Sequence, residues 1–236
     1  MKKNFRLLLL LPFILNIAAC KEEPSKDKAV SVSEKSTDEV EAQPSAETNK
    51  GDKAPELVTR IIIDTSMGVI ELDLNAEKAP LTVANFLLYI DSKHFDDTVF
   101  HRVIEDFMIQ GGGFAASGDE KETLASIKNE SANGLSNARG TIAMARTNHP
   151  DSATAQFFIN VGDNTNLDGG NGRPGYTVFG KVVSGIDVVD AIRAVKTGQK
   201  TMKAMDPDGR LYSQPFQDVP MKDVVIKSIK RSNDSP

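Results

Sequence analysis

Residues 100–114 read FHRVIEDFMIQGGGF and place one fixed cation, Arg102, among apolar residues. The stretch predicts two short strands, 99–104 and 107–110, joined by a turn at residues 105–106. Because alternate side chains of a strand share a face, Arg102 can lie beside Phe107 and Met108. The same alternation turns His101 to the opposite face, where we expect it to form structural hydrogen bonds. A charge held against aromatic and thioether surface marks this stretch as the candidate functional site.

The three glycines at 111–113 end this stretch. A glycine-rich segment can bind phosphate, but here no Lys-Ser/Thr pair follows and no helical pattern begins nearby. Glycine within a strand also permits another part of the chain to approach the backbone closely. We therefore expect residues 111–113 to form a bend of a barrel.

Short strands dominate the rest of the chain. Alternating or apolar runs predict further strands at residues 57–65, 69–74, 140–145, 156–161, 176–183 and 223–228. Helical spacing of apolar residues predicts helices at 80–94 and 186–195. Residues 115–137 and 198–219 are predicted to be long loops. Many short strands and few helices indicate a mainly β fold, a closed eight-stranded antiparallel β-barrel capped by two α-helices.

The N-terminus carries targeting signals. Residues 1–19 combine three basic residues, an apolar run at 7–15 and small residues before Cys20, the layout of a secretory signal. Residues 17–20, IAAC, resemble the lipobox of bacterial lipoproteins, which implies lipidation of Cys20 after cleavage. A plain signal peptide with an incidental Cys is the alternative. We expect a protein anchored in the bacterial cell envelope, facing the periplasm, and held at the outer membrane if the cell has one.

Residues 21–56 contain almost no large apolar side chain. Such a segment cannot bury enough apolar area to offset the entropy of ordering it. Together with Cys20 it is predicted to be a disordered tether spanning about 30 Å. The folded domain is then expected at 57–232.

Composition excludes several kinds of function. A net charge of −5 offers no basic surface for nucleic acid. The single Cys and three His residues give no ligand set for a structural metal site. No Gly-x-Ser-x-Gly motif supports a serine hydrolase. We expect no cofactor or metal, and a monomer.

Four motifs together resemble the cyclophilins, a family of peptidyl-prolyl cis/trans isomerases. They are residues 100–114, the run RGTIAMA at 139–145, DSATAQFFIN at 151–160 and YTVFG at 176–180. The resemblance covers about residues 57–230. It implies a barrel packed with apolar side chains and a substrate groove on its outer surface. The implied partners are proline-containing polypeptides, such as unfolded or exported proteins.

The resemblance also implies roles for residues that match the motifs. Catalysis would fall to Arg102 and Gln110. The implied substrate-binding residues are Phe107, Met108, Ala145, Arg146, Gln156, Phe158, Leu167 and Tyr176. Among these, Arg146 stands where many members have Asn, so only its backbone contact carries over, and Tyr176 stands where many have His.

Other departures from the family concern the rim of the groove. Asn166 replaces a Trp or another aromatic residue, which weakens the expectation of tight cyclosporin binding. Glu105 and Asp106 replace Pro-Gly in the turn between the groove strands. The segment 196–216 is longer than in short bacterial members.

The implied chemistry breaks no covalent bond. When an X-Pro amide twists, its nitrogen loses conjugation and becomes a better hydrogen-bond acceptor, so a guanidinium aimed at it stabilises the transition state. Two rivals remain. One is a non-catalytic module that binds proline segments or acts as a chaperone in the envelope. The other is an assembly protein scaffolded through its tether.

Overall fold

The computed structural model describes residues 58–206 and 208–232. The predicted signal peptide, Cys20 and the tether lie outside these residues. In the described part of the chain, no helix has the length and apolar character needed to cross a membrane.

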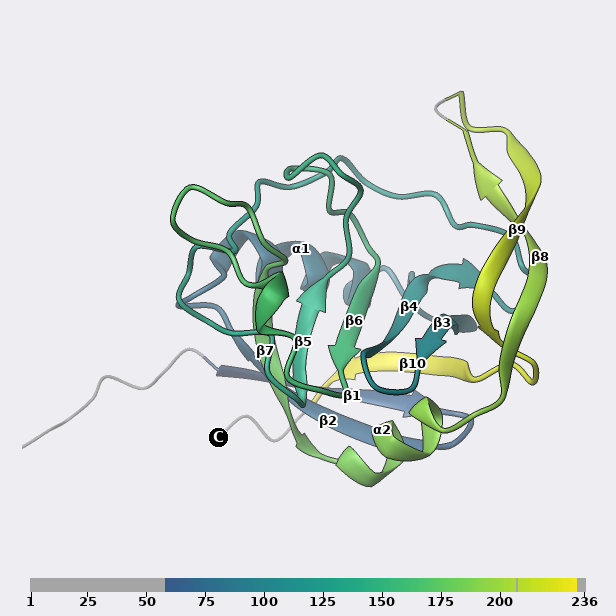
Figure 1. The fold of residues 1–236 in the computed structure, drawn as a ribbon, viewed down its shortest axis with the longest axis horizontal. Coiled ribbons are helices and arrows are strands. Elements are labelled where there is room, and N and C mark those ends of the chain that lie inside the picture. Colours follow the sequence, from purple (N-terminus) through teal and green to yellow (C-terminus); the bar gives the residue numbers. More distant parts are fainter. Residues whose placement is uncertain (1–57, 207, 233–236) are drawn as a thin grey trace, which may run out of the picture. The chain divides into compact units, whose positions relative to one another are not determined.

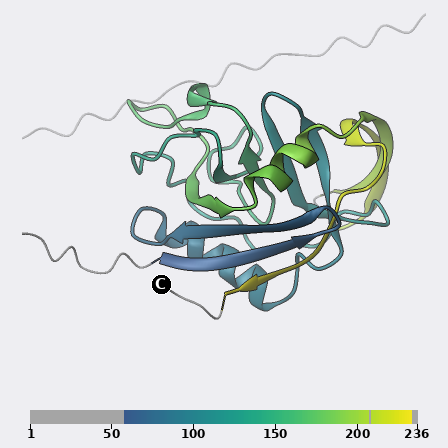
Figure 2. The ribbon, with the colours of Figure 1, turned by 90° about the horizontal axis from the view of Figure 1, so that it is seen from below.

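Eight strands form a closed antiparallel barrel in the order β1-β10-β3-β4-β6-β5-β7-β2 (Figure 1). Their bounds are β1 Val58–Thr65, β2 Gly68–Asn75, β3 Thr98–Ile104, β4 Met108–Ala115, β5 Thr141–Met144, β6 Phe157–Asn160, β7 Val178–Ser184 and β10 Val225–Arg231. The first two pair along their whole length, as Figure 2 shows from below. The predicted fold class and barrel strands are confirmed.

Two helices cover the barrel. Helix α1 (Pro80–Asp91) and helix α2 (Ile186–Arg193) lie on opposite sides of it in Figure 1. Proline suits the first turn of α1 because the backbone N–H groups there have no partner within the helix. The helix ends at Asp91, three residues before the predicted end. A short 3₁₀ helix, η1 (Thr165–Leu167), follows β6.

The barrel interior is an aromatic and aliphatic core. Phe86 of α1 packs against Phe95, Phe157 and Phe179, with ring centroids 4.8–5.5 Å apart. Val189 and Ile192 of α2 are fully buried in the same cluster. Side chains therefore fill the barrel, and any binding surface must lie on its outside.

The glycine triplet allows this packing. Gly112 has φ +85°, and a Cβ there would lie 2.9 Å from the ring of Phe157. A Cβ on Gly113 would lie 2.5 Å from Nε2 of Gln156. Strand β4 runs through all three glycines, and the predicted close backbone approach is observed.

The prediction of a long loop at 198–219 is wrong. These residues form a two-stranded antiparallel hairpin of β8 (Thr197–Met205) and β9 (Leu211–Pro220) outside the barrel. The hairpin stands beside β3 (Figure 1). Its inner face buries Met202 against Val99, Phe114 and Val219. This apolar contact with residues about a hundred positions earlier stabilises strands that the local sequence did not indicate.

Candidate functional site

A groove of about 470 Å³ lies on the outer surface of the barrel. All ten groove residues proposed from the sequence line it: Arg102, Phe107, Met108, Gln110, Ala145, Arg146, Gln156, Phe158, Leu167 and Tyr176. Residues that the sequence interpretation missed line it as well: His101, Phe114, Glu120, Ala204, Met205, Tyr212, Gln214 and Phe216.

Strand register explains why the predicted residues meet. Arg102 on β3 faces Gln110 on β4, which faces Phe158 on β6, which faces Ala143 on β5. These four residues form one row across four strands on the outer face of the sheet. Because side chains alternate, Phe157 points into the core while Phe158 points out to the groove.

The apolar part of the groove is a cluster separate from the barrel core. Met108, Ala143, Phe158 and Val178 are its buried members, and Phe107, Ala145, Leu167 and Tyr176 are half-buried around them. The rings of Phe158 and Tyr176 meet edge to face, with centroids 5.8 Å apart. The cluster forms an outward-facing pocket whose rim is aromatic.

Arg102 borders this pocket and stays accessible. Its side chain is 43% exposed, and Nε lies 3.8 Å from Oδ2 of Asp218 on β9. Asp218 has φ +58°, a left-handed conformation that Asp tolerates better than most residues. At this distance the contact is an ion pair that leaves guanidinium N–H groups available to a ligand.

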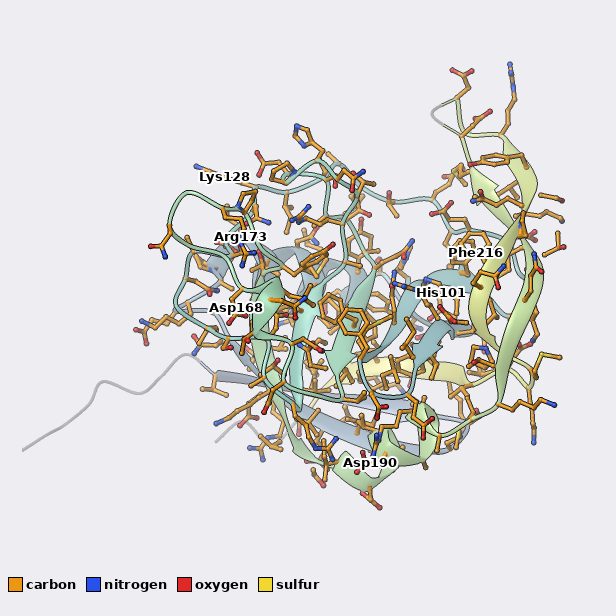
Figure 3. All side chains as sticks on the ribbon, in the orientation of Figure 1. His101, Lys128, Asp168, Arg173, Asp190 and Phe216 are labelled. Atoms are coloured by element: carbon orange, nitrogen blue, oxygen red, sulfur yellow. The ribbon has the colours of Figure 1, made fainter. Side chains whose placement is uncertain are left out.

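The expectation for His101 is wrong in its geometry. Phe100 pairs with Gly111 and Arg102 with Gln110, so His101 is an extra residue in β3, a β-bulge. The bulge turns His101 and Arg102 to the same side, and both line the groove. The His101 ring lies 4.8 Å from that of Phe114. His101 is labelled in Figure 3. Burial lowers the pKa of His101 to about 4, so the ring is neutral at physiological pH.

A chain of amides and a carboxylate crosses the groove next to Arg102. Gln110 Nε2 donates to Oε1 of Gln156 over 2.9 Å, and Gln156 Nε2 donates to Oε1 of Glu120 over 3.4 Å. The second carboxylate oxygen of Glu120 accepts from the Met205 backbone N–H over 2.7 Å. These bonds fix the two glutamines and join them to the hairpin.

The side chain of Arg146 contacts the rim of the groove, whereas the resemblance predicted only a backbone contact for this residue. Its guanidinium donates to the carbonyls of Thr147, Pro174 and Gly175 over 2.9–3.1 Å. It also lies 4.5 Å from the centre of the Tyr176 ring, a cation–π contact. Arg146 thus holds Tyr176 in place at the mouth of the pocket.

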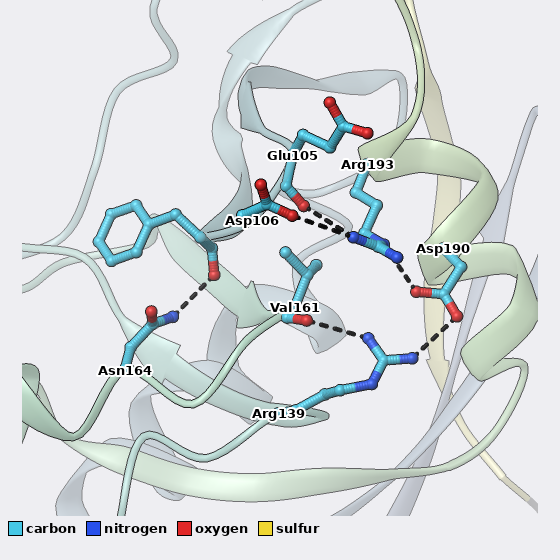
Figure 4. A network of polar contacts seen from close by, with 8 residues as sticks. Glu105, Asp106, Arg139, Val161, Asn164, Asp190 and Arg193 are labelled. Atoms are coloured by element: carbon cyan, nitrogen blue, oxygen red, sulfur yellow. Dashed lines mark hydrogen bonds and ion pairs between the residues drawn. The ribbon is translucent and has the colours of Figure 1, made fainter.

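A polar network that includes side chains of α2 holds the turn between β3 and β4 (Figure 4). Arg193 of α2 donates to the Glu105 carbonyl over 3.1 Å and lies 3.6 Å from Asp106. Asp190 accepts from both Arg193 and Arg139. This network fixes the turn that joins the two strands carrying Arg102 and Gln110.

A buried amide fixes the start of β4. Asn164 is 7% exposed and donates from Nδ2 to the Phe107 carbonyl over 2.7 Å and to Oδ1 of Asn160 over 2.8 Å. Asn166, two residues on, is exposed and does not line the groove. The rim there is therefore polar and open.

The arrangement offers the accessible guanidinium of Arg102 beside an apolar pocket, with the amide of Gln110 between them in the strand row. Such a site can bind an apolar ring and donate a hydrogen bond to an adjacent polar atom. Among the residues that the structure describes, no Ser, Thr or Cys lines the groove, and His101 is buried and neutral, so these groove residues supply no activated nucleophile.

Comparison with known proteins agrees with this geometry. A family model described as cyclophilin type peptidyl-prolyl cis-trans isomerase/CLD matches residues 60–231. The Streptomyces antibioticus peptidyl-prolyl cis-trans isomerase cyp18 is 53% identical over 176 residues, which cover 73% of this chain and 98% of that protein. Peptidyl-prolyl cis-trans isomerase B of Escherichia coli K12 is 48% identical over 172 residues, which cover 72% and 97%.

Solved structures share the fold. A crystal structure of a Cryptosporidium parvum cyclophilin type isomerase matches with a TM-score of 0.57 at 22% identity, covering 75% of this chain and 99% of that one. A second structure of that protein, in the presence of the dipeptide Ala-Pro, gives 0.56 at 23% identity and covers 74% and 99%. The family model and the sequence relatives show that this chain belongs to the cyclophilin-type peptidyl-prolyl cis-trans isomerases.

Proposed function

We propose that this isomerase acts without covalent chemistry, through Arg102, on proline-containing segments of exported proteins. The observation that carries the mechanism is the accessible guanidinium of Arg102 beside an outward-facing apolar pocket. A similar protein was crystallised in the presence of Ala-Pro, which agrees with a proline-sized ligand for such a groove.

The barrier to be lowered is that of amide rotation. Resonance holds the peptide bond flat with a barrier of about 18–20 kcal/mol, and uncatalysed X-Pro rotation takes tens to hundreds of seconds. As the bond twists, the nitrogen lone pair localises and accepts a hydrogen bond that the planar amide does not. A donor aimed at this nitrogen therefore binds the transition state better than either planar state.

Arg102 is the proposed donor. Its guanidinium is planar and presents several N–H groups in fixed directions. The Asp218 carboxylate lies near Nε, so the Nη groups are the ones directed to the substrate.

The pocket and the amides hold the two sides of the rotating bond. Phe107, Met108, Phe158 and Leu167 would grip the proline ring. Gln110, with the backbone at Ala145 and Arg146, would hold the residues before the proline. An acceleration of about 10⁵-fold needs about 7 kcal/mol, which one strong donor plus positioning can supply.

The test replaces the donor. Arg102→Ala is expected to lower kcat/KM for an X-Pro peptide by at least about a hundredfold, and Arg102→Lys by less, since an ammonium keeps the charge but not the geometry. Turnover is measured by NMR exchange or a protease-coupled assay, and folding by circular dichroism. Equal turnover in Arg102→Ala would discard the mechanism. Peptide binding without turnover by the unmodified protein would favour the non-catalytic module.

The proposal for the cellular place of the activity is supported by the N-terminal sequence alone. We propose that Cys20 is lipidated and that residues 21–56 hold the domain away from an envelope membrane, where exported proteins fold. We also propose that the protein acts as a monomer, since the proposed donor and the apolar pocket lie together in a single chain. Cys20→Ser should abolish incorporation of labelled palmitate and move the protein from the membrane to the soluble fraction. Unchanged fractionation with no label in either protein would reject the anchor.

A further inference from the structure

One face of β9 runs along the groove. Since side chains alternate along a strand, Tyr212, Gln214 and Phe216 share a face, and Asp218 follows in a register shift between Phe216 and Val219. The first three line the groove, and Asp218 lies at Arg102. The intervening residues, Ser213, Pro215 and Gln217, are exposed. The hairpin thus turns one side to the groove and the other to solvent.

The hairpin is fixed in this position at its base and near its tip. At the base, Phe216 packs against Phe114 with ring centroids 5.1 Å apart (Figure 3). Nearer the tip, the Lys203 N–H donates to the Gly118 carbonyl over 2.8 Å, and Lys203 Nζ lies 2.9 Å from Asp119. The hairpin is therefore a fixed wall of the groove.

The part of this wall near the tip is apolar and open to a ligand. Tyr212 is 47% exposed, although it lines the groove. Ala204, the strand partner of Tyr212, is small and leaves room next to the ring. The wall has apolar surface here with no other part of the described chain packed over it.

Hydrogen bonds and strand pairing place this surface near the two glutamines of the groove. Glu120 binds the Met205 N–H with one carboxylate oxygen and Gln156 with the other, and Gln156 is bonded to Gln110. The Met205 backbone therefore lies next to the two glutamines, and Tyr212, paired with the neighbouring Ala204, lies near the part of the groove where the residues before the proline are held in the proposed function.

We propose that Tyr212, with Ala204 beside it, forms a second subsite that selects an aromatic or large aliphatic side chain on the residue immediately preceding the proline. The inference rests on the proposed function for the position of the peptide. Its occupant is the substrate itself, because the apolar surface is continuous with the groove that holds the proline. The hairpin then acts as the specificity-determining element of the known reaction.

The experiment compares peptides that differ only in the residue X before proline, with X as Phe, Leu, Gly or Glu. The unmodified protein is expected to give the highest kcat/KM with Phe and Leu. Tyr212→Ala should lower the Phe-to-Gly ratio of kcat/KM about fivefold, which corresponds to about 1 kcal/mol. The matched control is Leu211→Ala, because Leu211 is 43% exposed on the same strand but does not line the groove. It should leave the ratio unchanged.

A second variant removes the part of the wall near the tip of the hairpin. Lys203 and Ser213 face each other in the hairpin, so residues 204–212 can be replaced by Asn-Gly, a sequence suited to a two-residue hairpin turn. This variant should lose the Phe preference at least as fully as Tyr212→Ala. The subsite would be overturned if the unmodified protein prefers Phe over Gly and neither variant changes the Phe-to-Gly ratio of kcat/KM. It would also be overturned if the unmodified protein gives equal kcat/KM values for the two peptides. Loss of all turnover in Arg102→Ala, found together with either result, would leave the proposed function standing.

Discussion

At the scale of single residues, the site depends on how Arg102 is placed. A bulge at His101 turns Arg102 and His101 to the same side, and Asp218 approaches Nε from the hairpin. Both partners of the ion pair are about 43% exposed, so the pair adds little to stability. Its contribution is to orientation: Asp218 limits the directions that a long, flexible side chain can take.

Replacing Asp218 tests this positioning. Asp218→Asn keeps a residue type that tolerates φ +58° but removes the charge. We expect kcat to fall about three- to tenfold with little change in KM, because the substrate still binds while the donor is less well aligned. Steady-state kinetics by NMR exchange measures both quantities.

Asp223→Asn provides the control for Asp218→Asn, since Asp223 is also ion-paired, to Lys200 over 2.8 Å, and does not line the groove. An equal loss of kcat in the two variants would show that net charge, and not the contact with Arg102, is responsible.

His101 gives the protein an acid-sensitive stability. Burial lowers its pKa from 6.5 to about 4 in the folded state, so the unfolded chain binds a proton at higher pH than the folded chain does. The free energy of unfolding should therefore be unaffected by His101 above about pH 6.5 and fall as the pH drops toward 4. By pH 4.5 the loss is on the order of 2 kcal/mol, at about 1.36 kcal/mol per pKa unit.

Urea unfolding between pH 7 and pH 4.5 measures this effect. His101→Gln removes the titrating ring and should flatten the dependence in this window. Burial and Lys121 also lower the pKa of His94, so some dependence remains in the variant. Identical pH profiles with and without the His101 ring would contradict the assignment.

At the scale of elements, strand β4 can carry site residues because its glycines let neighbouring side chains pack closely against its backbone. Gln110 precedes the triplet, and the missing side chain of Gly113 leaves the space that Gln156 occupies. Position 112 requires glycine for two reasons: its backbone is left-handed, and the rings of Phe157 and Phe95 leave no space for a Cβ. Strand β4 can thus serve the core and the groove together.

Two glycine substitutions distinguish these reasons. Gly112→Ala should destabilise the fold by about 3 kcal/mol or more, because strain at positive φ adds to a steric clash. Gly134→Ala, at φ +80° with no atom within 4 Å of the new Cβ, should cost only about 1 kcal/mol. Thermal and urea unfolding compare the two. Equal losses would show that backbone conformation alone requires Gly112.

At the scale of the whole molecule, the core and the groove lie on opposite faces of the same sheet. Inward residues of β4, β5 and β6 fill the barrel with the rings around Phe157, while their neighbours form the outer cluster around Phe158. Strand β10 closes the barrel by pairing with β1 and β3, which joins the two ends of the folded domain. Every residue of the groove lies between His101 and Phe216.

A chain that starts at residue 57 should therefore keep its activity. We expect kcat/KM on a soluble prolyl peptide within twofold of that of the protein starting at Cys20, because all groove residues and the closed barrel are retained. The two proteins are compared in one assay, with circular dichroism as the check on folding. A large loss in the shorter chain would show that residues 20–56 act on the site, in favour of the scaffolding alternative.

Local sequence was sufficient for the barrel strands, and the resemblance to the cyclophilins supplied the ten proposed groove residues. Period-two alternation reports which face of a strand is buried, and the motif around Arg102 carries its own turn and glycines. The roles of those residues stay predictions, since placement in a groove does not measure catalysis.

Tertiary structure alone decided the rest. The bulge at His101 depends on pairing with β4, and the β8–β9 hairpin depends on burial of Met202 and Phe216 against Val99 and Phe114. The available signal was the alternation of apolar and polar residues on both sides of a turn at Asp208 and Gly209. The apolar positions are Met202 and Ala204 before the turn and Tyr212 and Phe216 after it. This signal is weak because polar residues separate these positions and their apolar partners lie about a hundred residues away. Contacts of that range are set by the closed barrel, so the second wall of the groove emerges only once the chain has folded.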